Sequence, residues 1–475
     1  MVNEILIDDI KNRLYGVISR QFLISESDIT DEIGPGDLAA WDSIGQLQLI
    51  LAIEKAFDLQ LSVNDVMSIN NVKDIIDVLI KYSQSDEKVL QMDQKQAIEQ
   101  SVFHPLMVPG VTYWGNGSLS VLNSFNYKRV ALVTGTSSYA MRLVDRIRKM
   151  FPGVEFQDFH RTHGEPNENG INELALKLQS FSPDCIIAAG GGSTIDSAKL
   201  SWLLYEKPEF DLNSVEHSIY DFQLRHKASL IAVPTTFGSG SEVSSAATFT
   251  KTNQSSKTIL VSHDFIADKV ILDPALGEMT PLPLIYASAF DSLVHAIEGY
   301  VSIVNNPLLD PNAIMAVKNI LSALNKLKNK GLNGDILETL CYASYYAGIV
   351  QNHCSVGLTH SFAHQLWEFG VGHGQANALF LKSVIEYNST KTDKYTGLVS
   401  EIGFASVGEF IDEVGEIILE ANIFPDRDII NSILDKKNKV VEGAINDVTF
   451  RTNPVPLTKS EVETVFDNAI EKLRR

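Results

Sequence analysis

The sequence predicts a multidomain protein in which a small all-α bundle precedes an α/β domain and an all-helical domain. Its 475 residues exceed one ordinary domain, since domains average roughly 150 residues. The first 85 residues are acidic and helical in pattern, whereas the middle of the chain alternates short apolar runs with helical stretches. Strand patterns largely vanish beyond residue 282. We therefore expect units at 1–84, 104–281 and 282–475, with a polar linker at 85–103.

Composition and charge exclude several classes of protein. Hydrophobic residues make up 44% and charged residues 21%, which is typical of globular chains. A net charge of −20 argues against non-specific binding to nucleic acid or anionic membranes. No segment has the 18 or so consecutive apolar residues of a membrane span, and the first residues do not resemble a signal peptide. Three widely spaced cysteines fit a reducing compartment, so we expect a cytoplasmic protein.

The N-terminal unit contains a serine at the start of a predicted helix. Asp42 and Ser43 precede an apolar helical pattern, and further helical patterns cover Val2–Phe22 and Val72–Tyr82. Asp or Ser at this position is also an ordinary helix N-cap. The first 85 residues hold 14 acidic and 6 basic residues, so the bundle is strongly acidic.

This whole unit resembles an acyl or peptidyl carrier domain, with Asp42-Ser43-Ile44 in place of the family's Asp-Ser-Leu. The resemblance implies that a phosphopantetheinyl transferase attaches 4′-phosphopantetheine to Ser43, and that the arm carries an acyl thioester. A helix N-terminus favours the nearby phosphate. The unit's acidity suggests a basic-faced pathway enzyme as a partner, although Gln46 and Gln48 stand where family members often have acids and leave that partner open.

Two glycine-rich loops follow strand-like runs in the middle unit. Cys185-Ile-Ile-Ala-Ala leads into Gly190-Gly-Gly-Ser, and Leu230-Ile-Ala-Val leads into Pro234-Thr-Thr-Phe-Gly-Ser-Gly-Ser-Glu. Apolar runs of this kind, separated by helical patterns, predict a parallel sheet. One such loop by itself is explained equally well as a flexible turn, and neither matches GxGxxG. Two loops rich in Gly and hydroxyl groups, however, favour a dinucleotide site.

The third unit concentrates histidines near an aspartate. Asp291 and His295 are four residues apart, and His360, His364 and His373 follow within the same unit. An isolated i, i+4 pair is often only a surface contact. One carboxylate with three imidazoles, however, is a ligand set for Fe²⁺ or Zn²⁺, and not for Mg²⁺ or Ca²⁺.

Residues 104–475 resemble the iron-containing (group III) alcohol dehydrogenases. The matching motifs stand in family order: Gly190-Gly-Gly-Ser-x-x-Asp-x-x-Lys, Pro234-Thr-Thr-x-Gly-x-Gly-Ser-Glu, Asp273-Pro-Ala-Leu, Asp291-x-x-x-His-Ala-Ile-Glu and His373-Gly-x-x-Asn-Ala. The resemblance implies a Rossmann-like nucleotide-binding domain followed by an all-α metal-binding domain, as in the dehydroquinate synthase-like fold. The implied metal ligands are Asp291, His295, His360 and His373, and His364 is the implied proton relay. The expected cofactor-binding residues are Gly135, Thr136, Ser137, Gly191, Gly192, Ser193, Thr194, Thr235, Thr236, Ser239 and Lys257.

Two departures from the family pattern matter. His364 and His373 are nine residues apart, one fewer than usual, which leaves the choice between His360 and His364 as ligand open. Gly135 stands where many members have an aspartate that holds the adenosine ribose. Without that carboxylate a 2′-phosphate is admissible, so we expect NADP(H) in preference to NAD(H).

The sequence thus predicts a homodimeric, metal-dependent alcohol dehydrogenase or aldehyde reductase fused to a carrier domain. Hydride would pass between the nicotinamide and an aldehyde or alcohol that is either free or tethered to Ser43. Two alternatives remain: a recruitment protein whose dehydrogenase scaffold is idle, and a polyol dehydrogenase of the related glycerol dehydrogenase type.

Overall fold

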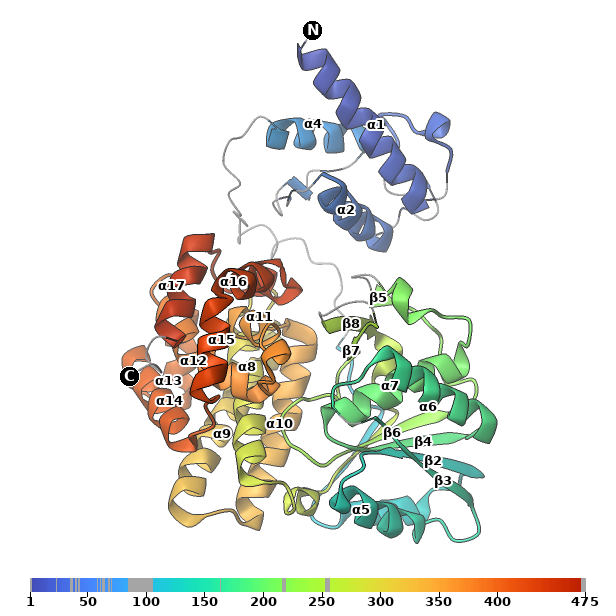
Figure 1. Cartoon of the computed structure of the whole chain (residues 1–475), viewed down its shortest axis with the longest axis vertical. Helices are drawn as coiled ribbons and strands as arrows, with labels where there is room; N and C mark the ends of the chain where they lie inside the picture. The colour runs from blue at the N-terminus through green and yellow to red at the C-terminus, as the bar shows by residue number, and fades with distance from the viewer. Residues whose placement is uncertain are drawn as a thin grey trace. The chain divides into compact units, whose positions relative to one another are not determined.

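The computed structural model describes residues 2–22, 24–34, 37–38, 41, 43–57, 59, 61, 65–66, 69, 71–83, 106–162, 164–215, 219–252 and 257–470. The chain divides into two units, one of residues 1–104 together with 456–458 and the other of residues 105–455 and 459–475. The predicted linker at 85–103 lies outside the described residues. Both units are drawn in Figure 1.

The N-terminal unit is helical, as its sequence pattern predicts. Its α-helices are α1 (Val2–Phe22), α2 (Ser43–Phe57) and α4 (Val72–Ser83). One apolar residue from each helix, Leu14, Ile53 and Ile75, is completely buried in a shared core. The Phe22 and Trp41 rings stack in this core with centroids 5.0 Å apart. Ser43 is the first residue of α2, while Asp42 lies outside the described residues.

The second unit begins with a six-stranded sheet in which every pairing is parallel. The spatial order is β1-β9-β6-β4-β2-β3. The strands are β1 (Val111–Trp114), β2 (Arg129–Thr134), β3 (Glu155–His160), β4 (Cys185–Gly190), β6 (Ser229–Pro234) and β9 (Lys269–Leu272). From β2 the chain moves outward to β3, and from β4 it moves the opposite way to β6. The adjacent strands β2 and β4 therefore flank a topological switch point, where open α/β sheets bind their ligands.

Helices cover both faces of this sheet (Figure 1). They are α5 (Ser138–Arg148), α6 (Glu168–Phe181) and α7 (Gly192–Glu206). Alternate residues of the central strands point to opposite faces: Ile186 packs with the core of α6 and α7, whereas Ile187 packs with that of α5. Burial on both faces explains why the strands read as continuous apolar runs.

A smaller sheet in the same unit carries one predicted cofactor residue. It consists of β5 (Ile219–Tyr220), β8 (Lys257–Ser262) and β7 (Ala246–Thr250), in that order, with β7 and β8 antiparallel. Lys257 is the first residue of β8.

The remainder of the unit is helical from Leu282, where strand patterns end in the sequence. Its α-helices are α8 (Leu282–Val301), α9 (Asp310–Lys330), α10 (Gly334–Cys354), α11 (Leu358–Ala363), α12 (His373–Asn388), α13 (Lys394–Ile402), α14 (Val407–Ala421), α15 (Arg427–Asp435), α16 (Lys437–Asn446) and α17 (Lys459–Ile470). Helix α8 is buried along most of its length and contacts α9, α10 and α12. In the described part of the chain, no helix combines the length and the apolar character that crossing a bilayer requires.

The loop after β6 connects the sheet to this helical part. A Cβ atom on Gly238 would lie 2.7 Å from Cα of Ser288 in α8, and one on Gly348 in α10 would lie 2.7 Å from Cα of Gly240. Ser292 of α8 donates to the carbonyl of Gly238 at 3.3 Å. Backbone contact at these points holds the second glycine-rich loop directly against α10 and against α8, which carries Asp291 and His295.

Candidate active site

Helix α8 supplies the first two side chains of the histidine cluster. Asp291 and His295 lie one turn apart, and only 6% and 2% of their surfaces are exposed. The Oδ1 atom of Asp291 is 3.7 Å from Nε2 of His295. The i, i+4 spacing therefore directs both side chains to the same point, and neither is on the surface.

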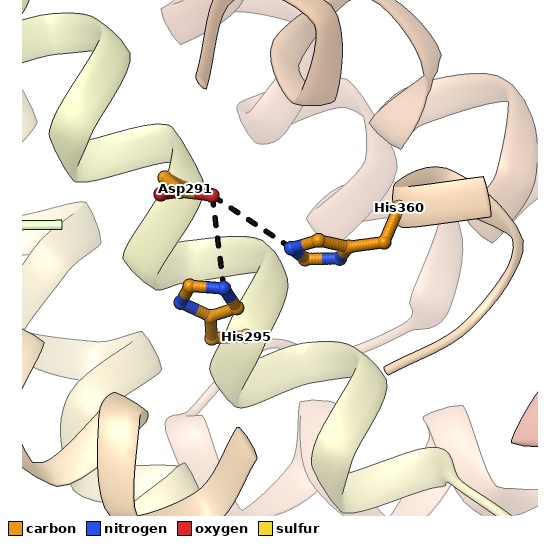
Figure 2. Close-up of side chains that lie close together, drawn as sticks. All are labelled: Asp291, His295 and His360. Carbon is orange, nitrogen blue, oxygen red and sulfur yellow. Dashed lines mark ion pairs between the residues drawn. The ribbon is translucent and has the colours of Figure 1, made fainter. Parts of the chain in front are cut away.

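Two further histidines reach that point from other helices. His360 lies on α11, and its Nε2 is 3.7 Å from Oδ1 of Asp291. His373 is the first residue of α12, and its Nε2 is 3.4 Å from the same oxygen. Figure 2 shows the side chains of Asp291, His295 and His360 turned toward one another.

These distances suit a tetrahedral metal site. Bonds of about 2.0–2.2 Å from a metal to its ligands imply separations of about 3.3–3.6 Å between the ligand atoms. The three imidazole nitrogens lie 3.4–3.7 Å from the carboxylate oxygen, close to that spacing, and the ligand atoms of Asp291, His295 and His360 lie within 4.8 Å of one another. The donor set is also the one expected for divalent iron or zinc. The residues present therefore fit such a metal.

The charge states of the cluster favour metal binding as well. Burial raises the pKa of Asp291, but the imidazoles of His295, His373 and His360 outweigh burial and hold it far below its usual range. Burial lowers the pKa of His295 to about 4 and that of His373 well below its ordinary value. Asp291 is therefore a carboxylate, and His295 and His373 are neutral imidazoles, which are the forms in which these groups bind metals.

Two buried residues hold the ligands in place. Asn377 of α12 donates from Nδ2 to Oδ1 of Asp291 at 2.7 Å. Glu298 of α8 accepts a hydrogen bond from Nδ1 of His360 at 2.8 Å. With burial opposing them, the carboxylates of Asp291 and Glu298 raise the pKa of His360 to about 9.

His364 is placed differently from the four candidate ligands. Its Nδ1 lies 2.9 Å from Oδ2 of Asp447, and its ring stacks on that of His373 with centroids 5.4 Å apart. Of the two histidines between which the sequence could not choose, His360 is therefore the one that faces Asp291. His364 lies beside His360 and His373, with its ring 6.1 Å and 5.4 Å from theirs between centroids.

All three predicted nucleotide loops lie at the carboxyl edge of the sheet. Gly135, Thr136 and Ser137 follow β2, the run Gly191–Thr194 follows β4, and Thr235, Thr236 and Ser239 follow β6. Because β6, β4 and β2 are neighbours, these loops are adjacent. The hydroxyl of Ser137 accepts from the amide of Ala140 and thereby caps α5.

Glycine is required where the loops meet. A Cβ atom on Gly191 would lie 2.8 Å from Oγ1 of Thr236, and one on Gly192 would lie 2.7 Å from Oγ of Ser239. The second loop therefore packs directly on the N-terminus of α7. Backbone amide groups at a helix N-terminus are suited to bind a pyrophosphate.

Two cations lie beside these loops. Arg161 follows β3, and its Nε donates to Oγ1 of Thr194 at 3.1 Å. Lys257 pairs with Glu165 at 3.3 Å, and its ammonium is among the charges that lower the pKa of His373. Lys257 therefore lies close enough to the histidine cluster to act on its charge.

Sequence reasoning missed Glu298, Arg161 and Asp447 as members of this site. Glu298 was detectable, since it falls seven residues after Asp291 and therefore on the same helix face. Arg161 was detectable only as a cation at the end of a strand. Asp447 follows His364 by 83 residues, and nothing in the local sequence connects them.

Comparison with known proteins identifies the family. Residues 109–274 match the model for iron-containing alcohol dehydrogenases, and residues 285–470 match the C-terminal model of the same family. Residues 13–79 match the phosphopantetheine attachment site.

Individual relatives agree with these matches. The chain is 31% identical to the NADPH-dependent butanol dehydrogenase of Clostridium saccharobutylicum over 379 residues, which cover 76% of this chain and 96% of that protein. It is 31% identical to an alcohol dehydrogenase of Thermococcus barophilus over 75% of this chain and 96% of that one. The iron-containing alcohol dehydrogenase structure from Thermococcus thioreducens superposes with a TM-score of 0.71 and 29% identity, covering 77% of this chain and all of that one. The chain therefore belongs to the iron-containing alcohol dehydrogenases and carries a phosphopantetheine attachment domain at its N-terminal side.

Proposed function

We propose that this protein reduces an aldehyde or ketone with NADPH at a divalent metal site formed by Asp291, His295, His360 and His373. The observation that carries the proposal is that three imidazole nitrogens lie within 3.4–3.7 Å of one carboxylate oxygen of Asp291. The loop after β6 supports it, because that loop contacts both α8 and the start of α7.

The cofactors would supply the chemistry that side chains lack: Lewis-acid polarisation of the substrate oxygen by the metal and a hydride from the nicotinamide. In reduction the hydride goes to the carbonyl carbon and one proton goes to the oxygen. His364 is suited to deliver that proton, because Asp447 orients its ring and leaves Nε2 available.

The preference for NADPH rests on charge at the switch point. Gly135 offers no carboxylate to repel a 2′-phosphate, and the guanidinium of Arg161 stands at the end of the next strand. Arg161 forms no ion pair within 4 Å in the described part of the chain, and its Nε and Nη1 donate to neutral oxygens. Glu165 and Asp196 are close enough to act on the charge of Arg161, but neither pairs with it directly. A half-buried cation of this kind beside the N-terminus of α7 favours a phosphate ligand.

Ser43 is the proposed attachment point for phosphopantetheine. There are two hypotheses for what the phosphopantetheine arm does. A thioester carbonyl is already at the oxidation level of an acid, so a tethered substrate would carry its reacting aldehyde, ketone or hydroxyl elsewhere in the acyl chain. In the other hypothesis, the carrier recruits a separate enzyme and the dehydrogenase acts on a free aldehyde.

Metal removal tests the enzymatic proposal. Protein stripped with a chelator should lose aldehyde reduction, and Fe²⁺ or Zn²⁺ should restore it. The Asp291→Asn variant should not take up metal under the same conditions, as measured by elemental analysis. Full activity of the metal-free protein would overturn the proposal, and a panel of aldehydes and polyols would exclude or support glycerol dehydrogenase chemistry.

A further inference from the structure

Glu298 combines deep burial with contacts to two neighbouring elements. It lies on α8 two turns after Asp291 and is 2% exposed. Its Oε2 accepts from Nδ1 of His360 at 2.8 Å and from the amide of Gly357 at 2.7 Å. Its Oε1 accepts from the amide of Thr359 at 2.7 Å.

Two of these bonds cap a helix from outside its own segment. Helix α11 begins at Leu358, and the amide groups at a helix start have no partner within the helix. An ordinary cap uses a Ser, Asp or Asn immediately before the helix, but Gly357 has no side chain. Glu298 reaches across from α8 instead, so the start of α11 is tied to the helix that carries Asp291 and His295.

The third bond determines which nitrogen of His360 is available. An imidazole that binds a metal is neutral and carries one N–H, and the carboxylate of Glu298 would keep that proton on Nδ1. The acceptor nitrogen is then Nε2, the atom that lies 3.7 Å from Oδ1 of Asp291. Carboxylates that hold the second nitrogen of a ligating histidine typically strengthen metal binding.

We propose that Glu298 is a positioning residue for the metal, acting through His360 by fixing its tautomer and anchoring α11. This inference rests on the proposed metal site. Helix α8 thereby contributes two ligands directly and controls a third.

The chain offers a matched control in Glu206. This carboxylate is also buried, at 8% exposure, and it also accepts backbone amides, those of His226, Lys227 and Ala228. It contacts no predicted metal ligand. Glu206→Gln therefore removes a buried charge that accepts backbone amides, and it leaves the candidate metal site unchanged.

The test is Co²⁺ affinity of the metal-free full chain, measured by competition with a chelator, for the native protein, Glu298→Gln and Glu206→Gln. We expect Glu298→Gln to bind Co²⁺ roughly 10–100-fold more weakly, with an altered Co²⁺ absorption spectrum, and Glu206→Gln to match the native protein. Glu298→Asp, which keeps the charge but shortens the reach, substitutes for Glu298→Gln if that variant does not fold.

A double variant tests whether Glu298 affects Co²⁺ affinity through His360. In a His360→Ala background, Glu298→Gln should weaken Co²⁺ binding no further. Equal affinity of the native protein and both Glu298 variants would overturn the inference while leaving the metal site intact. A native protein that binds no Co²⁺, Fe²⁺ or Zn²⁺ would instead overturn the proposed function itself.

Discussion

His364 differs from the candidate ligands in the direction of its ring. Its Nδ1 contacts Asp447, whereas Nε2 of His360 faces Asp291. His364→Asn should therefore lower kcat by roughly 10²–10⁴-fold, because proton delivery is lost. Metal content and the Kd for NADPH should be unchanged, as measured by elemental analysis and fluorescence titration. Loss of the metal in this variant would show that His364 is a ligand.

Arg161 is the residue whose removal tests the phosphate assignment. Losing a charge-assisted hydrogen bond costs about 1.5–3 kcal/mol, so Arg161→Gln should weaken NADPH binding by roughly 10-fold or more. Arg161→Lys keeps the charge but not the planar fork, and should show an intermediate loss. If only NADPH binds more weakly, Arg161 contacts the 2′-phosphate. If NADH binding weakens equally, Arg161 contacts the pyrophosphate, which both cofactors share. Unchanged affinity for both cofactors would contradict the assignment.

Glu242 makes the stability of the fold depend on pH. Burial raises its pKa from 4.5 to about 7, although Lys199 opposes this. Between these values the folded chain holds a proton that the unfolded chain has released, so the free energy of unfolding falls as pH rises through this window. Glu242→Gln should flatten that slope in urea unfolding, and the surface variant Glu173→Gln should keep it. An unchanged slope in Glu242→Gln would refute the claim.

At the scale of elements, the junction between α10 and the loop after β6 depends on two glycines. A methyl group on Gly348 would approach Cα of Gly240 to 2.7 Å and Cγ2 of Val243 to 2.8 Å. Gly348→Ala should therefore destabilise the protein by about 1–3 kcal/mol, although alanine favours a helix. Gly334→Ala on the same helix meets nothing within 4 Å and should be neutral or stabilising. Thermal melting of the two variants separates packing from helix propensity.

Elements also show how far sequence patterns reach. The apolar runs before Gly190 and at 230–234 predicted β4 and β6 almost to the residue, because buried parallel strands are apolar throughout. The small sheet of β5, β7 and β8 was not predicted, since its strands alternate between buried and half-buried positions and are short or irregularly spaced. The helical pattern from Leu282 predicted α8 correctly but could not show that the face carrying Asp291 and His295 is buried.

At the scale of the whole molecule, the carrier domain would act by concentrating a substrate near the dehydrogenase. A tether raises effective concentration without any new contact. After co-expression with a phosphopantetheinyl transferase, the native chain should gain the mass of the arm and Ser43→Ala should not. Ser43→Ala should also lose turnover of carrier-bound substrate while reducing free aldehydes at the native rate. An arm that is absent from the native protein ends the tethered form of the proposal.

The sequence by itself determined the family, the order of the domains and the residue types of the site. Short motifs with fixed spacing can be recognised in the sequence without knowledge of the fold. Asp291 with His295 and the glycines at 190–192 are of this kind. Only the tertiary structure decided that His360, and not His364, faces Asp291. It also decided which carboxylate contacts His360 and which cation lies beside α7. Those choices depend on helices and strands that are far apart in the chain, and packing between such elements leaves no local pattern to read.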